Sequence, residues 1–489
     1  MKRSAPLILP AHRHPYDRCV RLRRLLLGGL LVFTLGFAVF ALQHMLPPQP
    51  YGLADDWRVF YAAATVVQHG GNPYDASTIH AAEQAAQHYP SVQPSLDDFT
   101  DLPVVALLLR AVTWLPYWAS FTVFTLAGAA AALIALAAWL RDSGWTRPAL
   151  WLVAAMCSWV MLLGFFSGQF DALLLAGGVG GVLFMRRGRP WAAGLCMVVV
   201  LLKPHLLWPL PLLLFAVSLP DRRRAWPFAA AAAGVIGGGA ALGFLTVPGS
   251  AGFFGHLLGF GSRVGAVQPD LSGLPGMLLH LPGGSVAGTV LAAVGAAAVV
   301  ILAGAAVRAP RLRCLDERQR TLIPLAGLAL WLAAAPYAHP NDDVLLFPLL
   351  ALLIGADGRE LRGRPLAAGL VATLVVAAAF ITAPAAGYLV LAGGACLLVL
   401  RRRSLTASAV ATAALVAIAV LPAVWPFHVL AVPVTPVAVT VVAVAALMKL
   451  RDVRGGEPSS VGQGHRRGRV GGVVVEPAPA LAAQPARGN

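Results

Sequence analysis

The chain has 489 residues, of which 58% are hydrophobic and only 12% charged, and its mean hydropathy is +0.74. Soluble domains carry about 25% charged residues, so this composition excludes a soluble enzyme and a disordered chain, and the many apolar runs exclude a protein with a single membrane anchor. The formal net charge of +16 would favour a nucleic-acid partner in a soluble protein. In a polytopic membrane protein it indicates basic cytoplasmic loops instead, so we expect an all-α chain whose partner is the lipid bilayer and not a nucleic acid.

The basic N-terminal stretch, residues 1–24, precedes an apolar segment too long for the core of a signal peptide. We therefore expect that segment to be a retained first helix. A spanning helix needs about 20 mostly apolar residues, and candidates follow one another through a transmembrane region at 25–450. They are 25–46, 102–140, 149–166, 170–185, 191–219, 225–246, 286–307, 321–336, 344–354, 365–381, 385–400, 405–421 and 428–450. This pattern predicts about 12 to 14 transmembrane helices.

Two of these segments contain a break. The stretch 102–140 is too long for one span and holds Pro103 and Pro116, whereas 191–219 is interrupted by Lys203-Pro204-His205. Because proline ends or kinks a helix, the first is predicted to divide and the second to form two short spans or a broken helix. The tail, 451–489, is rich in Gly, Pro, Ala and Arg, and we expect it to be disordered and cytoplasmic.

Most of the 37 lysines and arginines lie in loops on one side of this zig-zag path. By the positive-inside rule that side is the cytoplasm, which predicts a multi-pass protein of the cell membrane with both ends inside. Four basic residues lie outside the cytoplasmic loops, within the membrane or beyond it, namely Arg58, Arg110, Lys203 and Arg263. Basic residues in such places are more often functional. The opposite side receives the acidic loop 47–101 and the outer loops 248–284 and 336–343. We therefore expect the chemistry on the extracytoplasmic side.

The first outer loop, 47–101, is the most informative. Asp55 and Asp56 precede WRVFYAAATVVQHG, which predicts a short helix that ends at Gly70-Gly71, and the Ala-rich piece 76–88 predicts a second one. Either acid could be an N-cap or first-turn residue. Alternatively, one of them is a general base, a carboxylate within reach of a hydroxyl in a shielded site. The spacing alone does not decide between these roles, nor between the two residues.

The broken segment has two interpretations as well. An intramembrane lysine either extends its charge to the membrane surface or pairs with an anion. Lys203 and the neighbouring His205 lie where a helix is interrupted, and half-helix ends form anion sites. A phosphate is the obvious anion at that depth.

Three further polar stretches follow the same logic. Gln169 lies in the turn GQFD, where Asp171 could simply cap the next helix. His339 could orient a substrate. Asp343 opens the next helix, and its role could be no more than to cap that helix. Arg263 lies in the long outer loop and could contact an acceptor headgroup. None of these stretches has the spacing of a convincing metal site.

Several of these motifs together resemble glycosyltransferase family 87. Asp56-Trp-Arg-Val-Phe-Tyr61, followed by Gly70-Gly71-Asn-Pro73-Tyr74, is similar to the first-loop signature of that family. Further matches occur in the family's order, at Pro103, Leu115-Pro116, Gly168-Gln169, Gly194, Lys203-Pro204, the basic turn 222–224, and His339 with Asp343. The chain departs from the family pattern at Asp101, where an aromatic-Pro-Pro run is usual, at Asp171 in place of Asn, and at Asp342-Asp343 after the late histidine.

The resemblance implies a membrane glycosyltransferase of the GT-C type, with a helical first outer loop. Such enzymes move a sugar, typically mannose, from a polyprenyl-phosphate donor to a glycolipid or glycan on the outer face. By this resemblance Asp56 is the general base, Lys203 holds the donor phosphate and His339 places donor or acceptor. The other residues expected to bind substrate are Asp55, Arg58, Tyr61, Tyr74, Gln169, His205, Arg263 and Asp343.

Inverting transfer needs one base for the acceptor hydroxyl and one cation for the leaving phosphate. A fixed lysine or arginine can replace a metal in that role, so we expect a metal-independent enzyme without a cofactor. The main alternative is a transporter or flippase of a lipid-linked or anionic substrate, which would distribute its charges along the bundle interior.

Overall fold

The computed structural model describes residues 54–86, 98–145, 148–257, 271–278, 284–308, 317–355, 374–375, 377–378 and 427–455. Within these ranges the chain is helical and contains no strand. Helices α5 (Tyr117–Asp142), α12 (Arg222–Thr246) and α15 (Gly284–Arg308) are each long and apolar enough to cross a membrane. Helices α6 (Pro148–Met156) and α7 (Trp159–Ser167) bend by 47° at their junction and could together form one further span. The predicted all-α polytopic fold is therefore confirmed.

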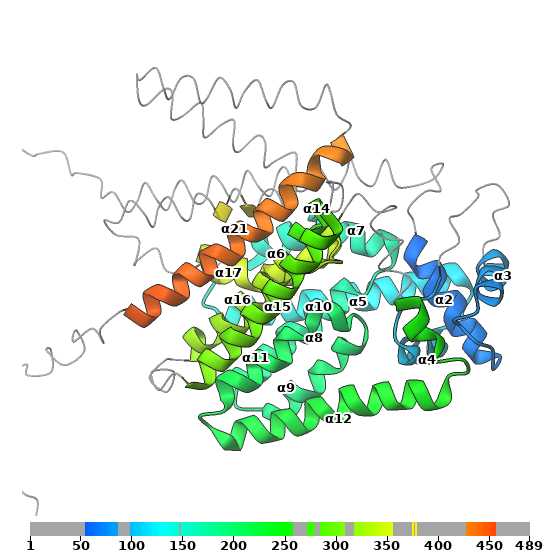
Figure 1. Ribbon diagram of the computed structural model, residues 1–489, viewed down its shortest axis with the longest axis horizontal. Helices are drawn as coiled ribbons and strands as arrows, with labels where there is room; N and C mark the ends of the chain where they lie inside the picture. The colour runs from blue at the N-terminus through cyan, green and yellow to red at the C-terminus, as the bar shows by residue number, and fades with distance from the viewer. Residues whose placement is uncertain are drawn as a thin grey trace, which may run out of the picture.

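The remaining helices pack against these spans and against one another (Figure 1). Helix α5 packs on α8 (Asp171–Arg186), and α12 packs on α9 (Pro190–Cys196). The other elements of the bundle are η2 (Met197–Leu201), α10 (Pro204–Leu207), α11 (Pro209–Ser218), α14 (Leu274–Leu278), α16 (Glu317–Ala334), η4 (Pro340–Leu346), α17 (Phe347–Gly355) and α21 (Phe427–Gly455). Gly194 shows how tight this packing is, because a Cβ at this position would lie 2.6 Å from the Phe228 carbonyl oxygen on α12.

The predicted breaks are present. The stretch 102–140 divides into α4 (Pro103–Leu109), the short turn η1 (Arg110–Val112) and α5, which begins after Pro116. The stretch 191–219 is broken at Lys203, between η2 and α10, as the following proline predicts. The break between η2 and α10 lies inside the bundle, where Lys203 is 6% exposed.

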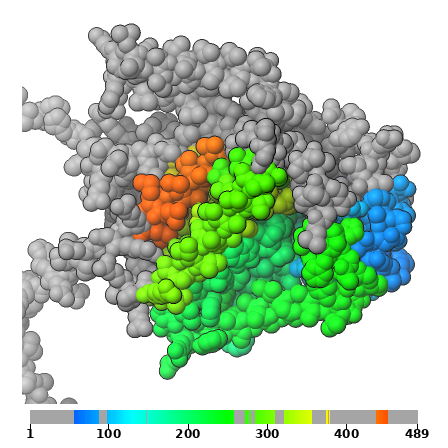
Figure 2. Space-filling model, in the orientation of Figure 1, coloured from blue at the N-terminus to red at the C-terminus, as the bar shows by residue number. Residues whose placement is uncertain are grey.

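The first outer loop is helical, as predicted. It forms α2 (Asp55–Gln68) and α3 (Ala76–Ala86), which pack on each other, and α2 also packs on α4. In the space-filling view these two helices form the blue end of the molecule (Figure 2). The buried stripe of α2 includes Trp57, Phe60 and Ala64, which fixes one face of this helix against the bundle.

Some predictions lie outside the described residues, namely the N-terminal stretch 1–24, the spans 25–46, 385–400 and 405–421, and most of 365–381. The total number of spans therefore stays a prediction. Several boundaries differ by a few residues, and α21 continues to Gly455, five residues into the predicted tail.

Candidate functional site

The start of α2 is held in place by long-range contacts. Ala54 is its N-cap, with a φ of 61° and no side-chain cap. The Ala54 N–H donates to the Phe166 carbonyl oxygen over 2.5 Å, and the Tyr117 hydroxyl donates to the Ala54 carbonyl oxygen over 2.7 Å. The N-cap interpretation of Asp55 and Asp56 is therefore wrong, and both are first-turn residues. A left-handed alanine is strained and persists only where its surroundings fix it.

Helix α2 is fixed to the turn between α7 and α8. Gly168 ends α7 with a φ of +79°, and a Cβ there would lie 2.5 Å from the Trp57 Cβ atom. The Trp57 indole N–H donates to the Ser120 hydroxyl over 3.1 Å, which holds the ring on α5. Asp56, the residue before this tryptophan, is partly exposed. The predicted base thus lies at the site where Gly168 and Gln169 turn the chain.

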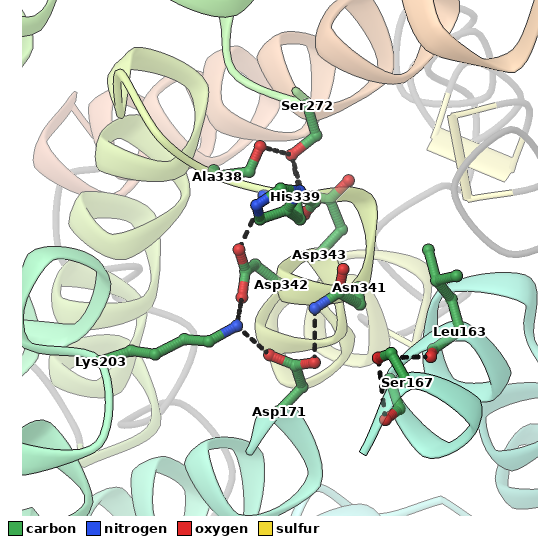
Figure 3. Close-up of polar contacts among 11 residues, drawn as sticks. Leu163, Ser167, Asp171, Lys203, Ser272, Ala338, His339, Asn341, Asp342 and Asp343 are labelled. Atoms are coloured by element: carbon green, nitrogen blue, oxygen red, sulfur yellow. Dashed lines mark hydrogen bonds and ion pairs between the residues drawn. The ribbon is translucent and has the colours of Figure 1, made fainter. Parts of the chain in front are cut away.

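The same turn begins a buried ionic network (Figure 3). The Lys203 Nζ atom lies 3.0 Å from Asp171 Oδ1 and 2.7 Å from Asp342 Oδ1. The second Asp171 oxygen accepts from the Asn341 amide over 2.7 Å, and the second Asp342 oxygen accepts from the His339 backbone N–H over 2.7 Å. The network joins α8, the break before α10, and η4. These stretches lie far apart in the sequence.

This network changes the interpretation of Lys203. Two carboxylates, each 1% exposed, already neutralise its ammonium group. Its charge therefore fixes the three stretches to one another, which differs from the expected direct contact with a donor phosphate. Asp171 does not cap α8 either, because Phe170 is the N-cap residue. These partners were not predictable from the sequence, because each aspartate alone is compatible with a cap.

Asp343 lies beside this network and is fully buried. One of its oxygens accepts from the Ser272 hydroxyl over 3.3 Å. Its Oδ2 atom is buried with no hydrogen-bond partner among the described residues. His339 is the N-cap of η4, so the alternative that Asp343 caps this helix is wrong.

A row of rings lies next to the Lys203 network. The exposed His205 ring is 5.8 Å from that of Tyr337, which meets the His339 ring edge-on at 4.8 Å. The His339 side chain accepts a hydrogen bond from the Asp342 backbone N–H in a capping box. Because that ring nitrogen accepts, the other one carries the hydrogen and is a donor.

Three residues expected to bind substrate have contacts within the protein, and their expected role stays a prediction. Arg58 is 2% exposed, and its Nε atom lies 3.6 Å from the Glu83 carboxylate on α3. The Tyr61 hydroxyl donates to the Leu115 carbonyl oxygen over 3.0 Å, and the Tyr74 hydroxyl donates to the Asp101 carbonyl oxygen over 2.7 Å. These contacts hold the first outer loop together.

The remaining expected site residues are less defined. The Gln169 side-chain oxygen is buried and has no hydrogen-bond partner in the described part of the chain. The Asp55 side chain and the whole of Arg263 lie outside the described residues. Their expected roles therefore stay predictions.

The sequence reasoning missed Asp101 as a site residue. Burial raises the pKa of its carboxyl to about 7, the Lys203 charge lowers it, and the Asp56 charge raises it. The charges of both Lys203 and Asp56 therefore act on the Asp101 carboxyl. Its presence where the family usually has an aromatic-Pro-Pro run was the one available signal.

Part of this chain is similar in sequence to a known family. The sequence model of glycosyltransferase family 87 matches residues 99–336, which include Asp101, the turn at Gly168 and Lys203. Asp56 and His339 lie outside the matched segment. Neither the curated proteins nor the solved structures include a match to this chain. Over residues 99–336, just under half of its length, the chain is therefore similar to the glycosyltransferases of family 87.

Proposed function

We propose that this protein transfers a sugar, most simply mannose, from a polyprenyl-phosphate donor to a glycolipid or glycan hydroxyl on the extracytoplasmic face of the cell membrane. The observation that carries this proposal is the turn between α7 and α8. The backbone N–H of Ala54, two residues before Asp56, donates to the Phe166 carbonyl oxygen at the end of α7. At the start of α8, the Asp171 carboxylate binds Lys203 and Asn341. A carboxylate base and an ordered polar network therefore meet at one end of the bundle.

The extracytoplasmic placement follows from α8. This helix begins at Asp171 and ends at Arg186, about 22 Å away at 1.5 Å per residue. The basic end belongs to the predicted cytoplasmic side. In this proposal the acidic end, with the first outer loop, belongs to the opposite side, and the cytoplasmic location of both chain ends stays a prediction from the basic loops.

In the proposed reaction Asp56 removes the proton of the acceptor hydroxyl. The acceptor oxygen forms a bond to the anomeric carbon of the sugar as the bond from that carbon to the phosphate oxygen breaks. The electron pair of the broken bond remains on the polyprenyl phosphate, and the proton remains on Asp56. A single displacement of this kind inverts the anomeric configuration, so a β-linked mannosyl donor gives an α-mannoside.

The leaving phosphate gains negative charge, and donors fixed in advance stabilise such charge. His339 supports this role, because its ring orientation is set by the capping hydrogen bond to Asp342. His205 lies on the same row of rings. In this proposal Lys203 acts through Asp342, which orients His339 by accepting from its backbone N–H.

The electrostatic role of Asp101 follows from its pKa of about 7. Below that pH its carboxyl is mostly neutral, which limits the negative charge near the arriving phosphate. Ionisation of Asp101 above that pH places a second carboxylate near Asp56 and opposes donor binding.

A test of donor class uses the purified full-length protein in lipid vesicles. Polyprenyl-phosphate-mannose and GDP-mannose, each radiolabelled, are offered with a membrane glycolipid extract as acceptor. We expect label to enter the glycolipid only from the lipid donor, with an inverted linkage by NMR. Transfer from GDP-mannose, or retention of configuration, would contradict the proposal. Movement of the lipid donor across the bilayer without product would support the transporter alternative.

A further inference from the structure

A second polar cavity lies at the opposite end of α8 from the candidate site. Its volume is about 250 Å³, and three arginines line it, Arg186, Arg224 and Arg320. Asp221 is the acid among the lining residues, and Val182 and Leu214 form part of an apolar wall. The proposed sugar transfer uses none of these residues.

The three arginines come from three helices that meet here. Arg186 ends α8, Arg224 lies in the first turn of α12, and Arg320 lies in the first turn of α16. Each arginine lies at one end of its helix, and all three line the same cavity. A binding site with this construction depends on the packing of the whole fold and not on one flexible loop.

Carboxylates fix the orientation of two of these guanidinium groups. The Arg186 Nη1 atom lies 2.7 Å from Asp142 Oδ2, and the Arg224 Nε atom lies 3.3 Å from Asp221 Oδ2. Arg186 also lies over the Trp139 ring, 5.7 Å from its centroid.

We propose that this cavity binds a phosphate group at the cytoplasmic membrane surface. Guanidinium groups bind phosphate through paired hydrogen bonds, and basic pockets between transmembrane helices bind anionic lipid headgroups on the cytoplasmic side. Two sources present that chemistry here, an anionic phospholipid and a soluble phosphate. The apolar wall of Val182 and Leu214 favours the phospholipid, because its glycerol and acyl groups pack against such a surface.

Native mass spectrometry of the purified full-length protein tests this proposal, with phosphatidylglycerol and phosphatidylcholine as the two probes. We expect wild type to retain phosphatidylglycerol in preference to phosphatidylcholine. Because each arginine near the surface contributes about 1 kcal/mol, the Arg224→Gln/Arg320→Gln variant should bind phosphatidylglycerol about thirtyfold more weakly. The matched control is Arg189→Gln/Arg222→Gln, which changes the charge equally at two exposed positions outside the cavity lining and should bind as wild type does.

A variant that is expected to strengthen lipid binding distinguishes a specific site from a damaged fold. Asp221 caps α12 by accepting from the Arg223 N–H over 3.1 Å, and asparagine caps helices equally well. Asp221→Asn therefore keeps the cap, removes the carboxylate from the lining, and should tighten phosphatidylglycerol binding. Lipid release by inorganic phosphate at equal affinity would assign the cavity to a soluble phosphate. Equal weakening in the control variant, or the absence of both lipid preference and phosphate binding, would overturn the proposal.

Discussion

Replacement of Lys203 by methionine tests whether this lysine organises the site. Methionine is flexible and apolar and fills irregular space well, so the variant removes the charge with little change in packing. In wild type the ammonium lies 3.0 Å from Asp171 and 2.7 Å from Asp342, and both carboxylates are 1% exposed. Without the lysine, two like charges remain buried with no counter-ion. Breaking a buried ion pair costs about 3–5 kcal/mol, and we expect a loss of this size in the free energy of unfolding.

Two matched variants separate this effect from a general loss of packing. Asp171→Asn leaves Lys203 paired with Asp342 and keeps an oxygen for the Asn341 amide, so it should cost only about 1 kcal/mol. The triple variant Lys203→Met/Asp171→Asn/Asp342→Asn removes every charge of the network. It should recover most of the stability lost in Lys203→Met, because neutral groups of similar volume carry no unpaired buried charge.

In the assay, the purified protein in mixed micelles is unfolded with increasing amounts of a denaturing detergent, and tryptophan fluorescence reports the unfolding. Donor binding is measured on the same preparations. If Lys203→Met is as stable as wild type and only weakens donor binding, the lysine contacts the phosphate directly. The interpretation of Lys203 as the link between α8 and η4 would then be refuted.

Three other predictions concern the first outer loop and the chemistry. Gly168→Ala should lower the transfer rate by displacing Trp57 and the adjacent Asp56, because its Cβ would lie 2.5 Å from the Trp57 Cβ atom. Gly188, the control position, has a similar φ of +68° and no neighbour within 4 Å. In thermal unfolding Gly188→Ala should show only the strain of a left-handed alanine, about 1–2 kcal/mol. An equal effect of the two variants on transfer would contradict the expected displacement of Trp57. The pKa of Asp101 is raised from 3.8 to about 7, so the folded state keeps this proton to higher pH than the unfolded state does. The stability of wild type relative to Asp101→Asn should therefore fall as the pH rises between these two values and stay constant above them. A pH-independent difference would place Asp101 in solvent. Transfer should be unchanged by EDTA, and activity lost to EDTA and restored by a divalent cation would show that a metal supports the leaving phosphate.

Local features of the fold were predictable because they depend on neighbouring residues. The segment WRVFYAAATVVQHG and the Gly70-Gly71 stop predicted α2, and the prolines at 116 and 204 predicted the breaks that follow from proline geometry. The partners of Lys203 were not predictable in this way. They lie 32 and 139 residues from it in the sequence, at Asp171 and Asp342, so only the packed bundle brings them together.

The error at the start of α2 has the same origin. Aspartate is a favoured N-cap residue, whereas alanine is not, so the local pattern pointed to Asp55 or Asp56. The observed N-cap at Ala54 is set by contacts with Phe166 and Tyr117, from two other helices. Tertiary bonds to the backbone thus decided the position of the helix end, and with it the placement of the proposed base.

The proposed role of Asp56 is tested most directly by measuring sugar transfer from radiolabelled polyprenyl-phosphate-mannose in wild type, Asp56→Asn and Asp55→Asn. Asparagine is close in size to aspartate and cannot accept the acceptor's proton, and the two variants make the same change at adjacent first-turn positions. We predict that Asp56→Asn abolishes transfer while donor binding and expression are retained, and that Asp55→Asn remains active. Undiminished transfer by Asp56→Asn would contradict the assignment of Asp56 as the base.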